Sequence, residues 1–334
     1  MNILLTGSQG FVGSYLCELL LSRGHTVIGV DDYSKYGRVA RSHDDHECFT
    51  LLEEDVIEIE DKSLARFAEI DVIIANAAMV GGVSYCNDYA YEILDRNNEI
   101  TAATMAMAIK LWNCGRLQRI VMVSSGMVYE TTDRFPTPED VICTPPTSMY
   151  GFQKLTCEYF CEAALQQHGL PYTIVRLANV VGVGEDATLG CETITSGNVK
   201  LMMSHVLPDF VNKVLGAQYP LHILGSGNQA RCYTNGKDIA YGICLATESK
   251  AAENQVFNIS TDQVTTVNEL AQAVWNALEM SRPLKIVHDE PYKYDIKTLI
   301  PDTSKAKALL GFEAKISLED SIKEVIDYVK HSQV

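Results

Sequence analysis

The apolar and polar positions in the first half of the chain follow two alternating patterns. Short apolar runs rich in β-branched residues alternate with longer segments whose apolar residues recur at helical spacing. Short strands that alternate with helices are typical of βαβ units, so the pattern predicts an α/β protein with a Rossmann-type, doubly wound parallel sheet. The predicted strands are Ile3–Leu5, Thr26–Val30, Asp71–Ala75, Arg119–Ser124 and Tyr172–Leu177, and the predicted helices are Phe11–Arg23, Lys62–Glu69, Asn98–Trp112 and Tyr150–His168.

The composition and the pattern of predicted elements change after Ala178. Glycines and polar residues become frequent there, and predicted helices mix with short strands. We expect residues 1–178 to form the sheet domain, with segments near 231–262 rejoining it. Residues 179–334 are expected to form mainly a smaller α/β region over the carboxyl ends of the strands, where open α/β folds bind ligands. The elements predicted in this half are Lys200–Leu215, Gly236–Thr247, Val256–Ile259, Val267–Met280 and Leu318–Lys330.

The composition narrows the classes of partner. The 334 residues are 47% hydrophobic and 21% charged, and their formal net charge of -16 argues against a nucleic acid or an anionic membrane as partner. The ten cysteines include no Cys-x-x-Cys pair, and the first strand follows no basic leader, which favours reduced thiols in a cytoplasmic enzyme. We interpret His43 and His46 as part of a solvated loop, so no metal site is predicted.

A glycine-rich segment joins the first predicted strand to the first predicted helix. Gly7, Gly10 and Gly13 would let the backbone approach a pyrophosphate, whose charge rests on the helix N-terminus. Asp31 ends the second strand, where a carboxylate binds an adenosine ribose and repels a 2′-phosphate, so NAD is favoured over NADP. Asp55 is a candidate for the adenine edge, although an ordinary loop aspartate fits as well. The other predicted cofactor-binding residues are Gln9, Phe11, Val12, Asp32, Val56 and Ala77.

Tyr150 and Lys154 are four residues apart on a predicted helix, so the phenol and the ammonium share one face. A nearby cation favours the phenolate, which predicts a pKa of Tyr150 drawn toward neutrality and a role in proton transfer at a hydroxyl group. Tyr233 also has a lysine four residues on, at Lys237, but Gly236 interrupts the spacing and no helix is predicted across it.

Ser125 ends the strand segment that leads to Tyr129, and it precedes Tyr150 and Lys154. With the glycine motif, these residues resemble the extended short-chain dehydrogenase/reductase family, and more narrowly its NAD-dependent nucleotide-sugar epimerase/dehydratase group. The resemblance covers nearly the whole chain. It implies that Ser125, Tyr150 and Lys154 are catalytic, that Ser125 also binds the reacting hydroxyl, and that Lys154 also binds the nicotinamide ribose of NAD.

The second half of the chain extends the resemblance to the substrate. The segment from Arg176 to Gly182 resembles one in which an asparagine, here Asn179, contacts the sugar nucleotide. Arg231 matches an arginine that binds the nucleotide diphosphate, and Tyr292 occupies the position where many UDP-sugar enzymes carry a second such arginine. The family implies a nucleotide-diphosphate-sugar substrate. It also implies a homodimer that pairs through the helix of Tyr150 and the helix before it.

Two departures from the family narrow the reaction. Sugar-nucleotide dehydratases carry an acidic pair where this chain has Gly126 and Met127, and decarboxylating relatives carry a glutamate at the position of Met127. The resemblance therefore implies C4 epimerisation through a transient 4-keto sugar. The alternatives are a 4,6-dehydratase, a keto-sugar reductase and, from another class, a non-catalytic cofactor-sensing protein. Gly81 and Gly82 resemble a segment of GDP-sugar enzymes, so the sequence does not identify the base of the substrate's nucleotide.

Overall fold

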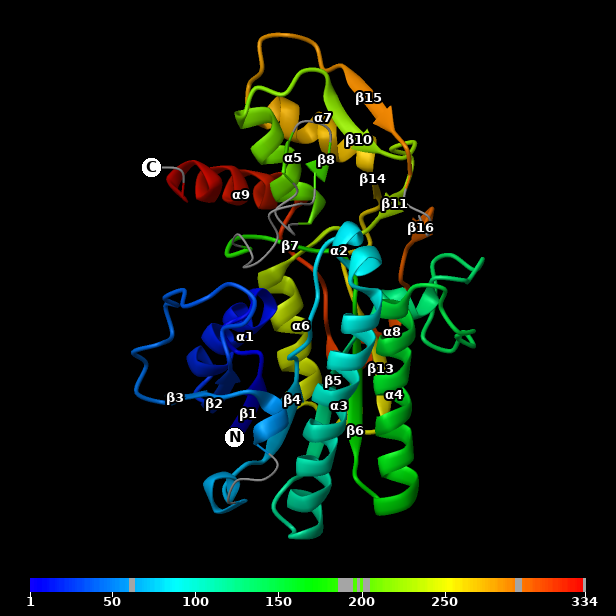
Figure 1. Ribbon diagram of the computed structural model, residues 1–334. Helices are drawn as coiled ribbons and strands as arrows, with labels where there is room; N and C mark the ends of the chain where they lie inside the picture. The colour runs from blue at the N-terminus through cyan, green and yellow to red at the C-terminus, as the bar shows by residue number, and fades with distance from the viewer. Residues whose placement is uncertain (60–63, 186–194, 197–198, 201–204, 292–295, 333–334) are drawn as a thin grey trace.

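The computed structural model describes residues 1–59, 64–185, 195–196, 199–200, 205–291 and 296–332. Seven strands form its main sheet in the order β13-β6-β5-β4-β1-β2-β3, and every neighbouring pair is parallel (Figure 1). The order changes direction between β1 and β4, which confirms the predicted doubly wound sheet. The strands are β1 (Asn2–Thr6), β2 (Thr26–Asp31), β3 (Phe49–Glu53), β4 (Val72–Ala75), β5 (Arg119–Ser125), β6 (Tyr172–Leu177) and β13 (Gln255–Ile259).

Helices cover both faces of this sheet. The pleat sends alternate side chains to opposite faces, so Ile3 and Leu5 of β1 join one apolar core and Leu4 joins the other. Both faces are buried, which explains why the strands read as continuous apolar runs. The helices are α1 (Phe11–Ser22) and α6 (Gly236–Glu248) on one face, and α3 (Ala90–Asn113) and α4 (Met149–His168) on the other.

A smaller lobe with its own apolar core lies beyond the carboxyl ends of the strands (Figure 1). It contains α5 (Val206–Leu215), α7 (Val267–Ala277), α9 (Leu318–Ser332), β10 (Leu221–Leu224) and β15 (Ile286–Asp289). The remaining short elements are α2 (Val83–Asp88), α8 (Ser304–Leu310), β7 (Val180–Val181), β8 (Thr195–Ser196), β9 (Val199–Lys200), β11 (Ala230–Arg231), β12 (Thr234–Asn235), β14 (Thr265–Thr266), β16 (Thr298–Leu299) and the 3₁₀ turns η1 (Val56–Glu58), η2 (Leu64–Phe67), η3 (Gly126–Tyr129) and η4 (Lys250–Ala252). Within the described ranges, none of the helices has the length and apolar character needed to cross a membrane.

Some predicted helix boundaries were wrong. The helix predicted from Asn98 begins at Ala90. The sequence pattern missed its first turns because Tyr91, Glu92 and Asp95 are exposed there, which leaves little apolar periodicity. The helix predicted from Lys200 begins at Val206 instead. Residues 199–200 pair as the short strand β9, and residues 201–204 lie outside the described part of the chain.

An ion-pair cluster ties the start of β2 to the end of α6. Arg23 donates two hydrogen bonds to the Glu248 carboxylate, at 2.9 and 2.5 Å, and the ring of His25 contacts it at 2.9 Å. Partial burial opposes ionisation of Glu248, but the hydrogen bonds from Arg23 and His25 outweigh it and hold the pKa of this carboxyl below its usual value. The stabilisation is therefore present above the pKa of the unfolded chain and lost as the pH falls through the folded pKa.

We predict that Glu248→Gln lowers the Tm by roughly 2 °C at pH 7, because the variant cannot form the charged pair. At a second, acidic pH below the usual pKa of glutamate the difference should be smaller, because the wild-type carboxyl becomes protonated as the pH falls through its lowered folded pKa. Thermal unfolding followed by circular dichroism at both pH values measures the effect. Glu313→Gln, which breaks an exposed pair with Lys307, is the control and should leave Tm unchanged. An equal loss at both pH values would contradict the assignment.

Candidate active site

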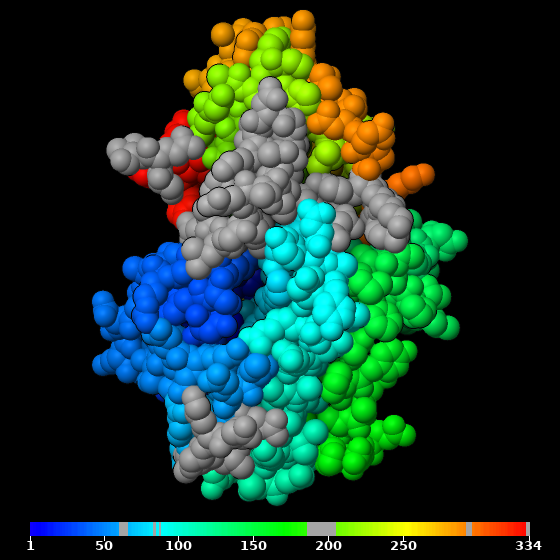
Figure 2. Space-filling model, in the orientation of Figure 1, coloured from blue at the N-terminus to red at the C-terminus, as the bar shows by residue number. Residues whose placement is uncertain are grey.

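A cleft of about 790 Å³ opens at the carboxyl ends of the central strands and is lined by residues of both lobes. Figure 2 shows a recess between the N-terminal residues, drawn in blue, and the α2–α3 segment, drawn in cyan. Gly13 packs behind the glycine loop and does not line the cleft, and Tyr292 lies outside the described residues. The other predicted site residues all line the cleft: Gly7, Gln9, Gly10, Phe11, Val12, Asp31, Asp32, Asp55, Val56, Ala77, Ser125, Tyr150, Lys154, Asn179 and Arg231.

The glycine loop needs its glycines for room and for backbone conformation. Gly7 has φ +71°, in the left-handed region, and its amide donates to the Val30 carbonyl at 2.8 Å. A Cβ on Gly13 would lie 1.9 Å from the Gly7 carbonyl oxygen, so any side chain there would displace the loop. Gly10 caps α1 without a side-chain hydrogen bond, which leaves the first amides of the helix directed toward the cleft.

Asp31 anchors the same loop from the end of β2. Its carboxylate accepts hydrogen bonds from the amides of Gln9 and Tyr33, both at 2.9 Å. Burial raises the pKa of Asp31, and these two amide hydrogen bonds oppose the rise. Asp32 is more exposed and accepts from the Ser34 amide at 2.9 Å.

The interpretation of His43 as a solvated residue was wrong. Only 2% of His43 is exposed, because its ring packs edge-on against Phe49 and lies beside the side chain of Gln9. Arg41, two residues earlier, donates two hydrogen bonds to the Gln9 carbonyl, at 3.1 and 2.8 Å. His46, by contrast, is exposed. This segment therefore supports the glycine loop from behind.

Asp55 holds a neighbouring segment in place at the edge of the cleft. Its Oδ1 accepts from the Ile57 amide at 3.1 Å and caps η1, and its Oδ2 accepts from Arg96 of α3. Arg96 also lines the cleft, and the sequence did not single it out. No sequence motif identifies Arg96, because its pairing with Asp55 arises only when α3 packs against η1.

Ser125, Tyr150 and Lys154 converge from β5 and α4. Ser148 caps α4 by accepting from the Gly151 amide at 3.1 Å, which fixes the first turn of the helix and places Tyr150 in it. Ser125 ends β5, accepts from the Met127 amide at 3.2 Å, and hydrogen-bonds the Tyr150 phenol. The hydroxyls of Ser125 and Tyr150 therefore lie together at one end of the cleft.

The predicted effect of Lys154 on Tyr150 was wrong for this geometry. The Lys154 ammonium donates to the Val123 carbonyl at 3.0 Å and lies 5.9 Å from the centroid of the Tyr150 ring. Burial raises the pKa of Tyr150 above its usual value, and the hydrogen bond from Ser125 only partly opposes the rise. Burial also lowers the pKa of Lys154. Desolvation, which the sequence does not reveal, outweighs the neighbouring cation.

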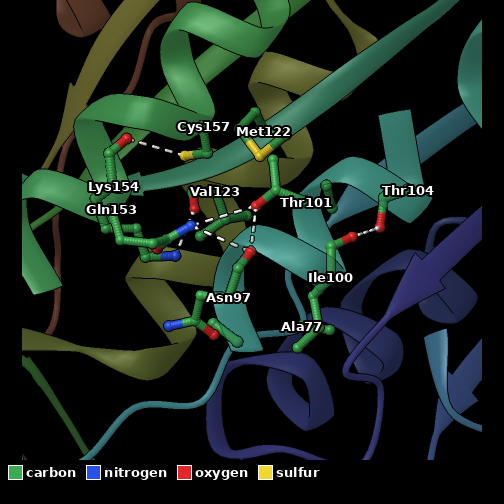
Figure 3. Close-up of a pocket in the computed structure, with 12 residues that line it drawn as sticks. Ala77, Asn97, Ile100, Thr101, Thr104, Met122, Val123, Gln153, Lys154 and Cys157 are labelled. Atoms are coloured by element: carbon green, nitrogen blue, oxygen red, sulfur yellow. Dashed lines mark hydrogen bonds between the residues drawn. The ribbon is translucent and has the colours of Figure 1, made fainter. Parts of the chain in front are cut away.

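Gln153, which precedes Lys154 on α4, is hydrogen-bonded to α3. Figure 3 shows Lys154 and Gln153 facing Asn97 and Thr101. Gln153 Nε2 donates to the Asn97 carbonyl and to the Thr101 hydroxyl, both at 3.3 Å. Asn97 in turn binds the backbone of Met79, accepting at 2.6 Å and donating at 2.9 Å. These contacts connect Gln153, the neighbour of Lys154 on α4, to the segment that follows β4, and sequence reasoning missed them because they join distant parts of the chain.

The far side of the cleft carries an amide, a guanidinium and an ammonium group. Asn179 has φ +37°, and its buried Oδ1 finds no hydrogen-bond partner among the described residues. Arg231 donates to the carbonyls of Ala230 and Ile296, which fixes its guanidinium at the wall. Lys35 also lines the cleft and was not predicted, although it lies close to Asp31 in the sequence.

The second Tyr-x-x-x-Lys match has no place in this site. Tyr233 is buried in the core of the smaller lobe, and α6 begins only at Gly236, as the interrupted spacing indicated. Lys237 pairs with Glu324 at 2.7 Å.

Arg176, which begins the Asn179 segment, lies behind the site and is not among the residues that line the cleft. It forms a buried, two-bonded ion pair with Glu158 of α4, at 2.9 and 2.6 Å. It also donates to the Tyr129 hydroxyl at 2.6 Å, and Tyr129 donates to Asn258 of β13 at 2.9 Å. This network joins α4 to the strands β6 and β13 and to the turn η3.

Comparisons with known proteins agree with this geometry. The chain is 25% identical to the UDP-glucose 4-epimerase of Mycolicibacterium smegmatis over 99% of each chain. It is 26% identical to the UDP-N-acetyl-alpha-D-glucosaminuronate decarboxylase of Bacillus cytotoxicus, over 98% of this chain and 97% of the relative. The crystal structure of UDP-glucose 4-epimerase from Thermotoga maritima with UDP-glucose superposes with a TM-score of 0.84, at 28% identity and over 100% of both chains.

Residues 3–260 match the model of the NAD dependent epimerase/dehydratase family. This stretch includes the glycine loop, Asp31, Ser125, Tyr150 and Lys154, which meet in one cleft. The chain therefore belongs to the NAD dependent epimerase/dehydratase family, and NAD is its cofactor.

Proposed function

We propose that the protein is a nucleotide-sugar 4-epimerase. The observation that carries the proposal is the meeting of the Ser125 and Tyr150 hydroxyls at one end of a cleft whose other end carries the glycine loop and Asp31. Relatives along the whole chain are named as UDP-sugar epimerases, which supports the same reaction class. A UDP-sugar is therefore the first substrate to test.

The residues of the cleft fit NAD. The exposed amides at the start of α1 and the close approach of Gly7 and Gly13 suit a pyrophosphate. Asp31 and Asp32 are placed for the hydroxyls of the adenosine ribose, and their charge disfavours a 2′-phosphate. We assign the adenine end of the cleft to Val56, Ala77 and the segment that Asp55 holds in place, and the nicotinamide ribose to Lys154, whose ammonium lies at the opposite end.

The proposed reaction is reversible oxidation at one carbon. When bound, NAD accepts the hydrogen of sugar C4 with its electron pair and later returns it. Tyr150, as phenolate, takes the proton of the C4 hydroxyl, while Ser125 hydrogen-bonds the same oxygen. The C4 carbonyl then takes the hydride back on its other face, and Tyr150 returns the proton. In the structure burial raises the pKa of Tyr150 and Ser125 opposes that rise only in part, so the phenolate that this step requires would need the positive charge that the nicotinamide of NAD carries when bound.

The residues beside Ser125 support epimerisation over elimination or decarboxylation. Gly126 and Met127 follow it in η3 and carry no acid. The acidic side chains that line the described part of the cleft come from the ends of β2 and β3 and from α3: Asp31, Asp32, Glu54, Asp55, Glu92, Asp95 and Glu99. None belongs to η3, so elimination would lack a proton donor beside the reacting carbon.

The diphosphate of the substrate needs local cations in an acidic protein. We assign Arg231 to this group, because a guanidinium can bind phosphate with two hydrogen bonds. Lys35 adds a second positive charge at the cleft wall, and the unpartnered amide oxygen of Asn179 suits a donor on the substrate. Tyr292 stays a prediction for this subsite. A screen of UDP-, GDP-, CDP- and dTDP-sugars with NMR of the products identifies both base and reaction.

We predict that Tyr150→Phe lowers kcat by about 10²- to 10⁴-fold on the substrate that the screen identifies, because it removes the group that exchanges the proton. The matched control is Tyr233→Phe, which deletes the hydroxyl of the other Tyr-x-x-x-Lys match and should leave kcat unchanged. The measurement is turnover by NMR with saturating substrate. Wild-type turnover by Tyr150→Phe would refute the proposed mechanism.

We predict that Gly13→Ala purifies with little or no NAD, because a Cβ at 1.9 Å from the Gly7 carbonyl forces the pyrophosphate loop out of place. The ultraviolet spectrum of the small molecules released on denaturation measures bound NAD. Gly216→Ala, at the end of α5, is the control: its Cβ would meet the carbonyl oxygens of Asn212, at 3.1 Å, and of Lys213, at 3.7 Å. Normal NAD content in Gly13→Ala would show that the loop tolerates the methyl group.

We also propose that two copies of the chain pair through α3 and α4, as the resemblance to extended short-chain dehydrogenases implies. Both helices present apolar residues on their outer face. Phe152 and Tyr159 of α4 are 38% and 59% exposed. Ala102, Ala106 and Ile109 form a neighbouring stripe on α3 at helical spacing. A second copy would cover this apolar surface.

We predict that Tyr159→Glu converts the dimer to a monomer, because it places a charge in the proposed apolar interface. Size-exclusion chromatography with light scattering should give twice the 36.9 kDa chain mass for the wild type and a single chain mass for the variant. Val264→Glu is the control: it changes an exposed apolar residue in a loop outside α3 and α4, and this variant should stay dimeric. A monomeric wild type would refute the interface.

A further inference from the structure

Arg96 lies at the edge of the cleft where three segments meet. It projects from the first half of α3 toward the loops that follow β2 and β3, and it lines the cleft with Asp32 and Asp55. The solvent-exposed fraction of its side chain is 28%, so the guanidinium is neither buried in the core nor surrounded by solvent.

The guanidinium is held in place from three directions. It donates to Asp55 Oδ2, lies 4.0 Å from Asp32 Oδ2, and contacts Glu99 at 3.4 Å. Asp55 is itself fixed, because its Oδ1 accepts from the Ile57 amide at 3.1 Å. An arginine restrained by a fixed carboxylate loses little further freedom when a ligand binds against it.

The position of Arg96 relative to the glycine loop decides what it can touch. With the pyrophosphate on the start of α1 and the adenosine ribose at Asp31, the adenine base extends past β2 toward β3. The cleft there is lined by Val56, Ala77 and Ile100, which are apolar, and by Arg96. A guanidinium is planar and stacks on aromatic faces, and it is attracted to their π-electrons.

We propose that Arg96 stacks on the adenine of NAD and that Asp55 sets the plane of its guanidinium. Asp55 then acts on the cofactor through Arg96. The proposal rests on NAD binding and not on epimerisation, so it goes beyond the proposed function and can fail or succeed independently of it. It names Arg96 as a cofactor-binding residue that helps to retain NAD between turnovers.

The test is the affinity of NAD-stripped protein for NAD and for two fragments of it, measured by titration calorimetry: ADP-ribose, which carries the adenine, and nicotinamide mononucleotide, which lacks it. For Arg96→Met we expect the Kd of NAD and of ADP-ribose to rise by the same factor, about tenfold, while that of nicotinamide mononucleotide is unchanged. Arg96→Lys keeps the charge but loses the plane, and a rise of about threefold is expected. NAD retained per chain after purification should fall in the same order.

Matched variants separate stacking from folding. Arg66→Met removes an arginine that pairs with Glu54 near the same loops but does not line the cleft, and its affinities should equal those of the wild type. Asp55→Asn should weaken ADP-ribose binding less than Arg96→Met. The double variant should bind no more weakly than Arg96→Met alone, because Asp55 acts through the arginine.

Two outcomes would overturn the proposal. One is an Arg96→Met protein that binds ADP-ribose within twofold of the wild type. The other is an Arg96→Met protein whose affinity for nicotinamide mononucleotide falls as much as that for ADP-ribose, which would indicate a general disturbance of the cleft. If Arg96→Met unfolds, Arg96→Lys decides the question, and an unchanged Kd of ADP-ribose in that variant would also refute stacking. None of these readouts requires turnover.

Discussion

The buried ion pair between Arg176 and Glu158 holds the two halves of the active site in register. Glu158 lies one helical turn after Lys154 on α4, and its carboxylate accepts from Arg176 of β6 and from the Ser124 hydroxyl of β5, the latter at 2.5 Å. Removing one partner of such a pair leaves a buried charge and costs about 3–5 kcal/mol. Because Ser124 precedes Ser125, the same carboxylate fixes α4 relative to the strand that carries Ser125.

Negatively and positively charged side chains line different parts of the cleft. Carboxylates gather at the ends of β2 and β3, where the hydroxyls of a ribose need acceptors. Arg231 and Lys35 line other walls of the cleft, and we propose that they bind the diphosphate of the substrate. A chain with a net charge of -16 can therefore bind two anionic molecules, because its local charges differ in sign from its mean.

Features that depend on local sequence could be predicted. The strand–glycine–helix segment, Asp31 at the end of β2, and the shared face of Tyr150 and Lys154 each follow from short-range spacing, and the structure places all of them at one edge of the sheet. Ser125 came from the family resemblance, and its contact with Tyr150 agrees with that expectation.

Features that depend on long-range packing could not be predicted. Arg96 and Asp55 are 41 positions apart in the sequence, and the burial of His43 follows from the fold of the loop around Gln9. The pKa of Tyr150 is raised because desolvation exceeds the effect of nearby groups, and spacing carries no information on burial. In the sequence, Arg176 belongs to the segment that resembles a substrate-binding motif. In the structure, its guanidinium pairs with Glu158 and holds α4 in place.

The most direct measurement of the proposed chemistry uses a nucleotide sugar that carries deuterium at C4, turned over by the holoenzyme in ordinary water. Because the same hydrogen leaves C4 and returns to it, NMR should find the product inverted at C4 with its deuterium retained. Loss of the deuterium to solvent, or a product altered at another carbon, would contradict reversible redox at C4.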